Sequence, residues 1–305
     1  MPANKKQKAY APPARAVPEV RKSAGTLYIC ATPIVNLEDT SSMLIRTLNE
    51  ADIILAEDTR TVRKLLSRFA VSKPQSAITG YQDFSSEAKL EYVVGKINEG
   101  KNIALVSESG TPAIQDPGFR IIRRCVDEGI KISVIPGPNA ALSALVLSGL
   151  STDSFLFLGF LPRKAPKLKE KLQEVKYLPY TLIIYESPRR AVGLLEILLE
   201  QIGDRECSLA RELTKIYEEV LRGMISEIIK ILKERNNKGQ ALKGEITITV
   251  EGCGKEPVKE FSMEQIKREY KRLLLQNFSR KEALKILRSR FRIDRQLLYN
   301  CTLKA

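Results

Sequence analysis

The chain has 305 residues, a formal net charge of +14 and a hydrophobic content of 43%. That size allows more than one compact domain, and no apolar run approaches the ~20 residues that a bilayer requires, which argues against a membrane-spanning helix. Histidine is absent, which excludes histidine general bases, serine–histidine and cysteine–histidine nucleophile pairs and most catalytic zinc sites. We therefore predict no metal site.

The positive charge is concentrated at the two ends of the chain. Residues 1–24 carry a net charge of +5 and residues 255–305 carry +8, which leaves +1 for everything between them. A nearly neutral centre with two basic ends favours a polyanionic partner, although a basic tail serves a solubilising role equally well. The five cysteines form no C-x-x-C pair, which is typical of reduced thiols in a cytoplasmic protein.

Strands and helices are predicted to alternate in the first half of the chain. Residues 1–24 are rich in Pro, Ala and Lys and predict a disordered basic arm. Within residues 25–161, apolar runs predict strands at 26–31, 51–56, 102–107 and 132–136, and helices at 42–50, 62–69, 88–99, 118–128 and 140–147. Such alternation predicts an α/β domain with a largely parallel sheet.

A second α/β domain is predicted over residues 162–254. A strand at 154–160 precedes a proline-containing hinge at 161–166, which places the boundary near residue 161. Further strands are predicted at 180–185, 207–212 and 245–251, and helices near 189–201 and 226–235. The last strand alternates polar and apolar residues, which predicts that one of its faces is solvated.

Residues 255–305 predict a small, basic helical unit. Ser262 with Gln265 and Ser279 with Glu282 form capping-box patterns, and Asp294 is a third candidate cap, so three short helices fit. A small core is predicted from the helical spacing of Phe278, Leu284, Leu287 and Phe291. The basic residues predicted to bind an RNA backbone are Lys281, Lys285, Arg288, Arg292 and Arg295.

Polar or glycine-rich loops follow four of the predicted strands directly, at residues 32–34, 57–60, 108–112 and 137–139. In an open parallel sheet the carboxyl ends of the strands share one edge, where small ligands bind. The loops therefore predict an enzyme whose site is spread over several segments. Residues 107–112 lack the Gly-Lys-Ser/Thr ending of a phosphate-binding P-loop, so that interpretation is rejected.

An ordered series of motifs extends from Gly25 to about Gly252. The series comprises Gly25–Ile34, Ala56–Arg60 with Arg63–Leu66, Ser109–Pro112 with Asp116–Gly118, Ile135–Pro138, Phe155–Arg163, Tyr185–Pro188, Ala210–Lys215 and Lys243–Glu245. In this order the motifs resemble the ribosomal RNA small-subunit methyltransferase I family, within the tetrapyrrole-methylase superfamily. The basic helical tail also resembles the C-terminal extension of that family.

The resemblance implies two α/β domains of tetrapyrrole-methylase type with S-adenosylmethionine in the cleft between them, and a homodimer. It implies methylation of the ribose 2′-hydroxyl of a cytidine in the decoding region of small-subunit ribosomal RNA. Backbone at Gly110 and Gly137 can approach a sulfonium donor closely, although both loops fit ordinary tight turns as well. The remaining implied donor contacts are Pro33, Ser109, Thr111, Pro112, Ile114, Asn139, Ala140, Ser187, Leu213 and Gly244.

Carboxylates beside the predicted cleft are candidates to accept the hydroxyl proton during methyl transfer. Glu57 and Asp58 are the first candidates, with Arg60 beside them, and Arg60 and Arg63 could hold neighbouring phosphates. Asp58 fits the N-cap of the following helix equally well, and Arg60 fits an ion pair with an acid.

Other charged residues at the predicted cleft leave alternatives open. Glu186 and Glu212 also end apolar runs and are rival bases. Arg189, Arg190 and Arg211 fit either phosphate contacts or ordinary ion pairs.

Six positions depart from the family pattern. Val35 and Ala113 stand where the family has Gly, Thr61 and Arg189 where it tends to have His, and Glu108 and Asn139 where it has Asp and Ser. If the first glycine position requires a positive φ, Val35 costs of order 1–3 kcal/mol there. Two alternatives follow: an RNA-binding protein that has lost catalysis, and a methylase of an anionic tetrapyrrole, against which the basic tail argues.

Overall fold

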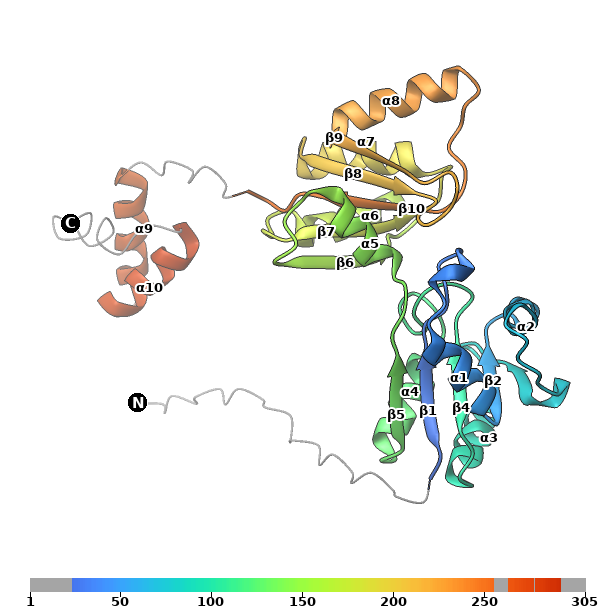
Figure 1. Ribbon diagram of the computed structural model, residues 1–305. Helices are drawn as coiled ribbons and strands as arrows, with labels where there is room; N and C mark the ends of the chain where they lie inside the picture. The colour runs from blue at the N-terminus through green and yellow to red at the C-terminus, as the bar shows by residue number, and fades with distance from the viewer. Residues whose placement is uncertain (1–23, 255–262, 277, 292–305) are drawn as a thin grey trace, which may run out of the picture.

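Two five-stranded sheets, each covered by helices, organise the molecule (Figure 1). The computed structural model describes residues 24–254, 263–276 and 278–291. The strand order is β3-β2-β4-β1-β5 in the first sheet, and every pair is parallel. Its elements are β1 (Thr26–Cys30), η1 (Leu37–Asp39), α1 (Ser42–Glu50), β2 (Ile53–Ala56), α2 (Thr59–Arg68), η2 (Gln75–Ala77), β3 (Ile78–Gly80), α3 (Glu87–Asn98), β4 (Ile103–Val106), α4 (Phe119–Asp127) and β5 (Lys131–Ile135).

Helices cover both faces of the first sheet. Leu27, Leu55 and Leu105 pack with α3 and α4 on one face, and Ile54 and Val106 pack with α1 and α2 on the other. A strand that is buried on both faces must be apolar throughout, which explains the unbroken apolar runs of β2 and β4. The predicted parallel sheet and its helices are therefore confirmed. The short β3 was not predicted, because three residues carry no measurable alternation.

The second sheet is mixed, with the strand order β6-β7-β10-β8-β9. β6 and β7 are parallel, and the other neighbouring pairs are antiparallel. A core of leucines and isoleucines joins its strands to α6, α7 and α8. Its elements are α5 (Ala140–Ser148), β6 (Phe155–Phe160), α6 (Ala165–Val175), β7 (Thr181–Glu186), α7 (Ala191–Ile202), β8 (Glu206–Arg211), β9 (Glu219–Met224), α8 (Ile225–Asn237) and β10 (Ile246–Val250).

The boundary between the two sheets lies earlier than the sequence predicts. β6 pairs with β7, so it is a strand of the second sheet (Figure 1). α5 packs against β8 and β10 and therefore covers the same sheet. The chain crosses over between Ile135 and Ala140. The prediction assigned β6 to the first domain, because alternation of strands and helices does not reveal which sheet a strand joins. Part of the predicted hinge at 161–166 instead begins α6.

β10 contradicts the prediction of a solvated face. All five of its residues are buried, because the strand lies at the centre of the sheet. Ile246, Ile248 and Val250 face the core under α7 and α8. Thr247 and Thr249 point to the opposite face, which α5 covers. The alternation therefore reflects two different buried surfaces.

Two helices of the C-terminal unit pack against each other, α9 (Met263–Leu275) and α10 (Arg280–Phe291). Leu284 and Leu287 contribute to their small core as predicted, whereas Phe278 is 40% exposed and lies outside it. The predicted capping box is confirmed at Ser279, whose backbone N–H donates to Glu282 Oε2 at 2.9 Å while Glu282 N–H donates to Ser279 Oγ at 3.3 Å.

Some predictions fall outside the described residues. These are the basic arm at residues 1–23, the caps at Ser262 and Asp294, and the side chain of Phe291. In residues 24–254, 263–276 and 278–291, no helix combines the length and apolar character needed to cross a membrane.

Candidate functional site

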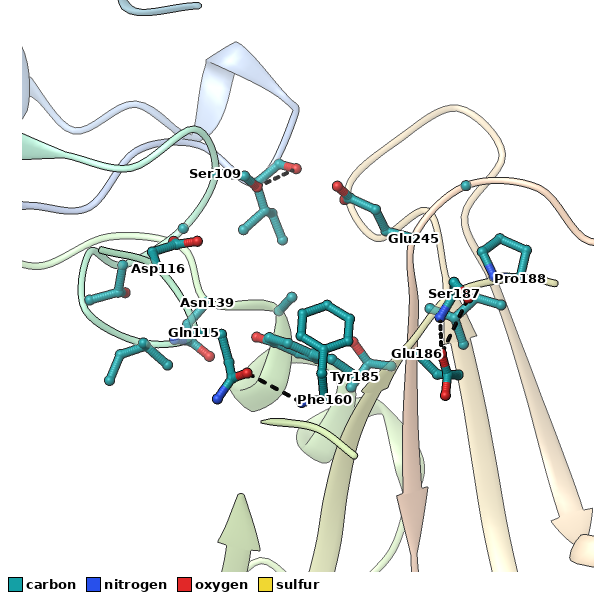
Figure 2. Close-up of a pocket in the computed structure, with 18 residues that line it drawn as sticks. Ser109, Gln115, Asp116, Asn139, Phe160, Tyr185, Glu186, Ser187, Pro188 and Glu245 are labelled. Atoms are coloured by element: carbon teal, nitrogen blue, oxygen red, sulfur yellow. Dashed lines mark hydrogen bonds between the residues drawn. The ribbon is translucent and has the colours of Figure 1, made fainter. Parts of the chain in front are cut away.

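Loops of the first sheet meet strand ends of the second sheet around a cavity of about 340 Å³ (Figure 2). The first sheet and the crossover supply Ile34, Ser109, Gly110, Thr111, Ile114, Gln115, Asp116, Asn139 and Ala140. The second sheet supplies Phe160, Tyr185, Glu186, Ser187, Pro188, Gly244, Glu245, Ile246 and Thr247. The predicted cleft between two α/β units is therefore present, and eight of the twelve predicted donor contacts line it.

Backbone hydrogen bonds hold the loops after β1 and β4 together. Thr32 N–H donates to Gly110 O at 2.8 Å, and Gly110 N–H donates to Thr32 O at 3.2 Å. The Ser109 hydroxyl donates to Ile34 O at 3.2 Å. Gly110 has a φ of +79°, a conformation that costs glycine little. This wall of the cavity is thus fixed by paired backbone hydrogen bonds and by the Ser109 hydroxyl.

The N-terminus of α5 forms the crossover part of the wall. Asn139 Oδ1 accepts hydrogen bonds from Ala141 N–H and Leu142 N–H, both at 3.1 Å. This is the N-cap contact that satisfies backbone donors at the start of a helix. Asn139, which replaces the serine of the family pattern, therefore performs a capping role at the cavity edge.

Gly244 lies at a tight approach on the opposite wall. Its φ is +87°, and a Cβ at this position would overlap Glu212 Oε1. That oxygen accepts hydrogen bonds from Glu245 N–H at 3.1 Å and from Lys215 Nζ at 2.8 Å. The hydrogen bond from Lys215 lowers the pKa of Glu212. Glu212, a rival base in the sequence, therefore supports the Gly244 turn.

Aromatic rings form the apolar floor of the cavity. The ring of Tyr185 contacts Phe157 and Phe160 edge to face, with centroid separations of 5.0 Å and 5.6 Å. Burial raises the pKa of the Tyr185 hydroxyl. Tyr185 and Phe160 were not among the predicted site residues, although both lie in the motifs that resemble the family.

The carboxylate of Glu186 is engaged by neighbouring residues, which favours a positioning role over proton transfer. Its Oε1 accepts hydrogen bonds from the Ser187 backbone at 2.7 Å and from the Ser187 hydroxyl at 3.2 Å. Its Oε2 lies 3.3 Å from Arg190 Nη2. The side chain is 2% exposed. We therefore interpret Glu186 as a group that positions Ser187, and Arg190 as its ion-pair partner.

Asp58 forms the N-cap of α2 and an ion pair with Arg60. Asp58 accepts a hydrogen bond from Arg60 N–H at 2.7 Å, and Arg60 Nη2 lies 2.7 Å from Asp58 Oδ2. These hydrogen bonds lower the pKa of Asp58 to about 2. A carboxylate with so low a pKa is a weak base at neutral pH, so the structure favours the capping and ion-pair alternatives for both residues.

The pKa of Glu57 is shifted in the opposite direction to that of Asp58. Partial burial and the nearby charge of Glu108 raise its pKa. Burial and repulsion by Glu57 also raise the pKa of Asp116 to about 6, although a hydrogen bond with Ser107 opposes that shift. Asp116 was missed as a site residue, since its burial and its acidic neighbours arise only in the folded chain.

A second cavity of about 240 Å³ adjoins the other side of the β1 and β4 loops. It is lined by Thr32, Pro33, Val35, Leu37, Thr61, Val62, Lys64, Leu65, Ser107 and Glu108. Pro33, a predicted donor contact, therefore lies here instead. Val35 is absent from the described residues with positive φ, whereas Ala113 has a φ of 68°. The condition for strain at Val35 is therefore not met, and Ala113, which also replaces a glycine of the family pattern, is one of the described non-glycine residues with a positive φ.

The other three predicted donor contacts do not line the large cavity. Pro112 is buried. Gly137 allows close packing, because a Cβ there would come within 2.9 Å of Ala31 Cβ. Leu213 packs in a cluster with Ile34 and Ala144, behind the cavity wall. We conclude that these residues support the wall.

The predicted RNA-binding arginines differ in their surroundings. Arg63 and Arg189 are exposed. Arg211 Nε lies 2.7 Å from Glu219, which also contacts Arg235, so Arg211 belongs to a structural ion-pair group. Lys281, Lys285 and Arg288 belong to α10, but their side chains, like Arg292 and Arg295, lie outside the described residues. Within the described ranges, no cluster of three His, Cys, Asp or Glu residues could hold a metal ion.

Comparison with known proteins defines the class of this fold and site. The family model of Tetrapyrrole (Corrin/Porphyrin) Methylases matches residues 26–229, so the chain belongs to that family. The solved structure of diphthine synthase has a similar fold, with a TM-score of 0.55, 12% identity and coverage of 74% of this chain and 89% of that chain. The structure of the methyltransferase CobJ gives a TM-score of 0.52, 17% identity and coverage of 75% and 95%.

Similar proteins with assigned names identify the particular family within the tetrapyrrole methylases. The ribosomal RNA small subunit methyltransferase I of Halalkalibacterium halodurans is 45% identical over 77% of this chain and 78% of its own length. The protein of that name from Thermotoga maritima is 38% identical over 75% of this chain and 99% of its own length. The chain belongs to the ribosomal RNA small subunit methyltransferase I family, which confirms the predicted resemblance. Membership of a methylase family of this type implies S-adenosylmethionine as the methyl donor.

Proposed function

We propose that this protein transfers a methyl group from S-adenosylmethionine to the ribose 2′-hydroxyl of a cytidine in small-subunit ribosomal RNA. The observation that carries the proposal is the cavity between the two sheets, built by the same ordered loops that resemble the family. The names of the curated relatives support ribosomal RNA as the acceptor.

The residues around the large cavity fit the donor. Its volume of about 340 Å³ falls within the range of small-molecule sites, which bury apolar ligand surface and fix orientation with a few polar groups. Ile34, Ile114 and Phe160 provide apolar walls, and the turns at Gly110 and Gly244 bring backbone close to a ligand. When bound, S-adenosylmethionine supplies an electrophilic methyl group on a positively charged sulfur.

The second cavity supports a position for the acceptor. It adjoins the β1 and β4 loops that also line the donor cavity, so RNA bound there would lie next to the donor cavity, into which the acceptor ribose must extend. Lys64 lines it, and Arg63 is exposed on the same helix, where both could neutralise RNA phosphates. We propose that α2 guides the RNA toward the donor cavity and that the basic α9–α10 unit adds further phosphate contacts.

We also propose a cytoplasmic homodimer. Leu142 and Val146 on α5 are 49% and 73% exposed, and with Leu213 they line a groove of about 450 Å³. Apolar side chains gathered in this way favour a protein interface, and a second copy of the chain is the occupant that the resemblance implies.

A label-transfer assay tests the proposed function. The purified protein is incubated with donor labelled in its methyl group and with either small-subunit RNA or an anionic tetrapyrrole, and donor affinity is measured by calorimetry. We expect label in the RNA alone. Label in the tetrapyrrole would favour that acceptor class, and RNA binding without label would favour a binding protein that has lost catalysis.

Arg63→Ala tests the path of the RNA. We expect weaker RNA binding and a salt dependence reduced by about one phosphate contact, with donor affinity unchanged. Arg68→Ala, at the far end of the same helix, serves as the matched control. Equal effects of the two substitutions on RNA affinity would contradict the proposed position of the acceptor.

A further inference from the structure

Asp116 occupies a constrained loop at the edge of the donor cavity. The loop after β4 is fixed where Gly118 N–H donates to Asp83 Oδ1 at 2.8 Å and where Gln115 Oε1 accepts from Phe160 N–H at 3.3 Å. Ala113 and Gln115 both have a positive φ, of 68° and 66°. Non-glycine residues persist in this conformation only where their surroundings hold them, and such strain concentrates at functional sites.

The side chain of Asp116 faces the cavity. Figure 2 shows its carboxylate directed toward the space between Ser109 and Asn139, and the residue is half-buried. In the described ranges no Lys or Arg side chain lies within ion-pair distance of this carboxylate. Asp116 thus lines the donor cavity and forms no ion pair with a described Lys or Arg.

The groups that face Asp116 come from both sheets. Glu57 follows β2, Ser107 and Glu108 follow β4, and Tyr185 on β7 interacts with its charge from the second sheet. Glu245 lines the same cavity from the loop before β10. These neighbours are acidic or neutral. Burial and the charges of Glu57 and Glu108 raise the pKa of Asp116 to about 6, and the hydrogen bond with Ser107 opposes that shift. A carboxylate of this kind is mostly ionised at pH 7 and is a far better proton acceptor than Asp58.

We propose that Asp116 is the catalytic residue that accepts the proton of the acceptor hydroxyl, an inference that rests on the proposed function. In this step the O–H bond of the 2′-hydroxyl breaks and its proton moves to a carboxylate oxygen of Asp116. The hydroxyl oxygen forms a bond to the methyl carbon, and the carbon–sulfur bond breaks with its electron pair left on sulfur. The products are a 2′-methoxy group, a neutral thioether and protonated Asp116, so atoms and charges balance.

Glu57 is assigned a tuning role, because its charge acts on Asp116 rather than on the cavity. Removing that charge in Glu57→Gln weakens the repulsion that favours protonated Asp116, so the pKa of Asp116 falls. The substitution therefore moves the pH dependence of the reaction without removing the proton acceptor. A merely structural role for either carboxylate would produce no such displacement.

The first experiment measures kcat/KM for the donor between pH 5 and 8, a quantity that reports on groups of the free enzyme. Wild-type activity is expected to fall as the pH drops through about 6. Asp116→Asn is expected to lower kcat/KM by about 10²–10⁴-fold and to abolish this pH dependence, while Glu57→Gln moves it to lower pH. Asp153→Asn, an exposed position, is the matched control.

The second experiment does not depend on turnover. Donor binding is followed by calorimetry at pH 6 in two buffers that differ in ionisation enthalpy, which yields the number of protons released. The positive sulfur favours ionised Asp116, so the wild-type protein is expected to release a fraction of a proton that Asp116→Asn does not release.

The two experiments separate this inference from the proposed function. Wild-type protein that binds donor but methylates no RNA would overturn the function, and proton release would still test Asp116. If wild-type protein methylates RNA and Asp116→Asn matches it in pH profile and in proton release, Asp116 is not the proton acceptor.

Discussion

Replacing Gly244 by alanine should damage both stability and donor binding. The position has a φ of +87°, and a left-handed alanine costs roughly 1–2 kcal/mol. The new Cβ would also displace Glu212, which accepts from Glu245 N–H at 3.1 Å and from Lys215 at 2.8 Å. Loss of these contacts adds about 1–3 kcal/mol. We therefore expect the free energy of unfolding to fall by about 2–5 kcal/mol.

Gly149→Ala is the matched control for backbone strain. Gly149 has a φ of +79°, and a Cβ there would meet no atom within 4 Å. Its substitution should cost only the roughly 1–2 kcal/mol of the left-handed conformation. The comparison therefore isolates the effect of displacing Glu212 from that of the backbone.

Urea unfolding and donor calorimetry provide the measurements. We expect the donor Kd to rise at least about tenfold in Gly244→Ala, equivalent to about 1.4 kcal/mol, because Glu245 and Gly244 both line the cavity. The Kd of Gly149→Ala should match wild type. Equal donor affinity in the two variants would refute the assignment of this wall to the donor site.

Three further predictions follow from the contacts of single side chains. Asp58→Asn should leave methyl transfer essentially unchanged, because asparagine also caps helices well; a loss of about 10²-fold or more would restore Asp58 as a general base. Hydrogen bonds from two arginines lower the pKa of Glu219 to about 2, so its stabilising effect is present above pH ~4.5 and is lost as the pH falls toward 2. Glu219→Gln should cost about 1–2 kcal/mol at pH 7 after allowance for solvent screening, and much less at pH 2, where about half of the carboxylates are protonated, in pH-dependent urea unfolding. Ala113→Gly should stabilise the protein by about 0.5–1 kcal/mol through relief of its left-handed strain, and destabilisation in urea would contradict this.

The first sheet was predictable because burial on both faces leaves a direct mark on the sequence. β4 is apolar throughout and is followed at once by polar residues, so its strand and loop could both be predicted. The sheet to which β6 belongs could not be predicted, since the pairing of a strand is determined by the tertiary structure. The same holds for β10, whose threonines face α5 and not solvent.

The candidate site was predictable only in part. Short motifs indicated loops such as Ser109–Pro112, because turn chemistry is local. The chemistry of Asp116 depends on burial and on Glu57, which lies 59 positions earlier in the chain and reaches it only after folding. Which residues adopt a positive φ likewise depends on the path of each loop, which is why Ala113 and Gln115 do so and Val35 does not.

Identification of the methylated nucleoside tests the central claim most directly. Small-subunit RNA labelled by the wild-type protein is digested completely to nucleosides, which are separated and identified by mass spectrometry. The proposed function, whose choice of nucleoside rests on the family resemblance, predicts 2′-O-methylcytidine as the labelled product. A methyl group on the base, or on any nucleoside other than cytidine, would contradict it.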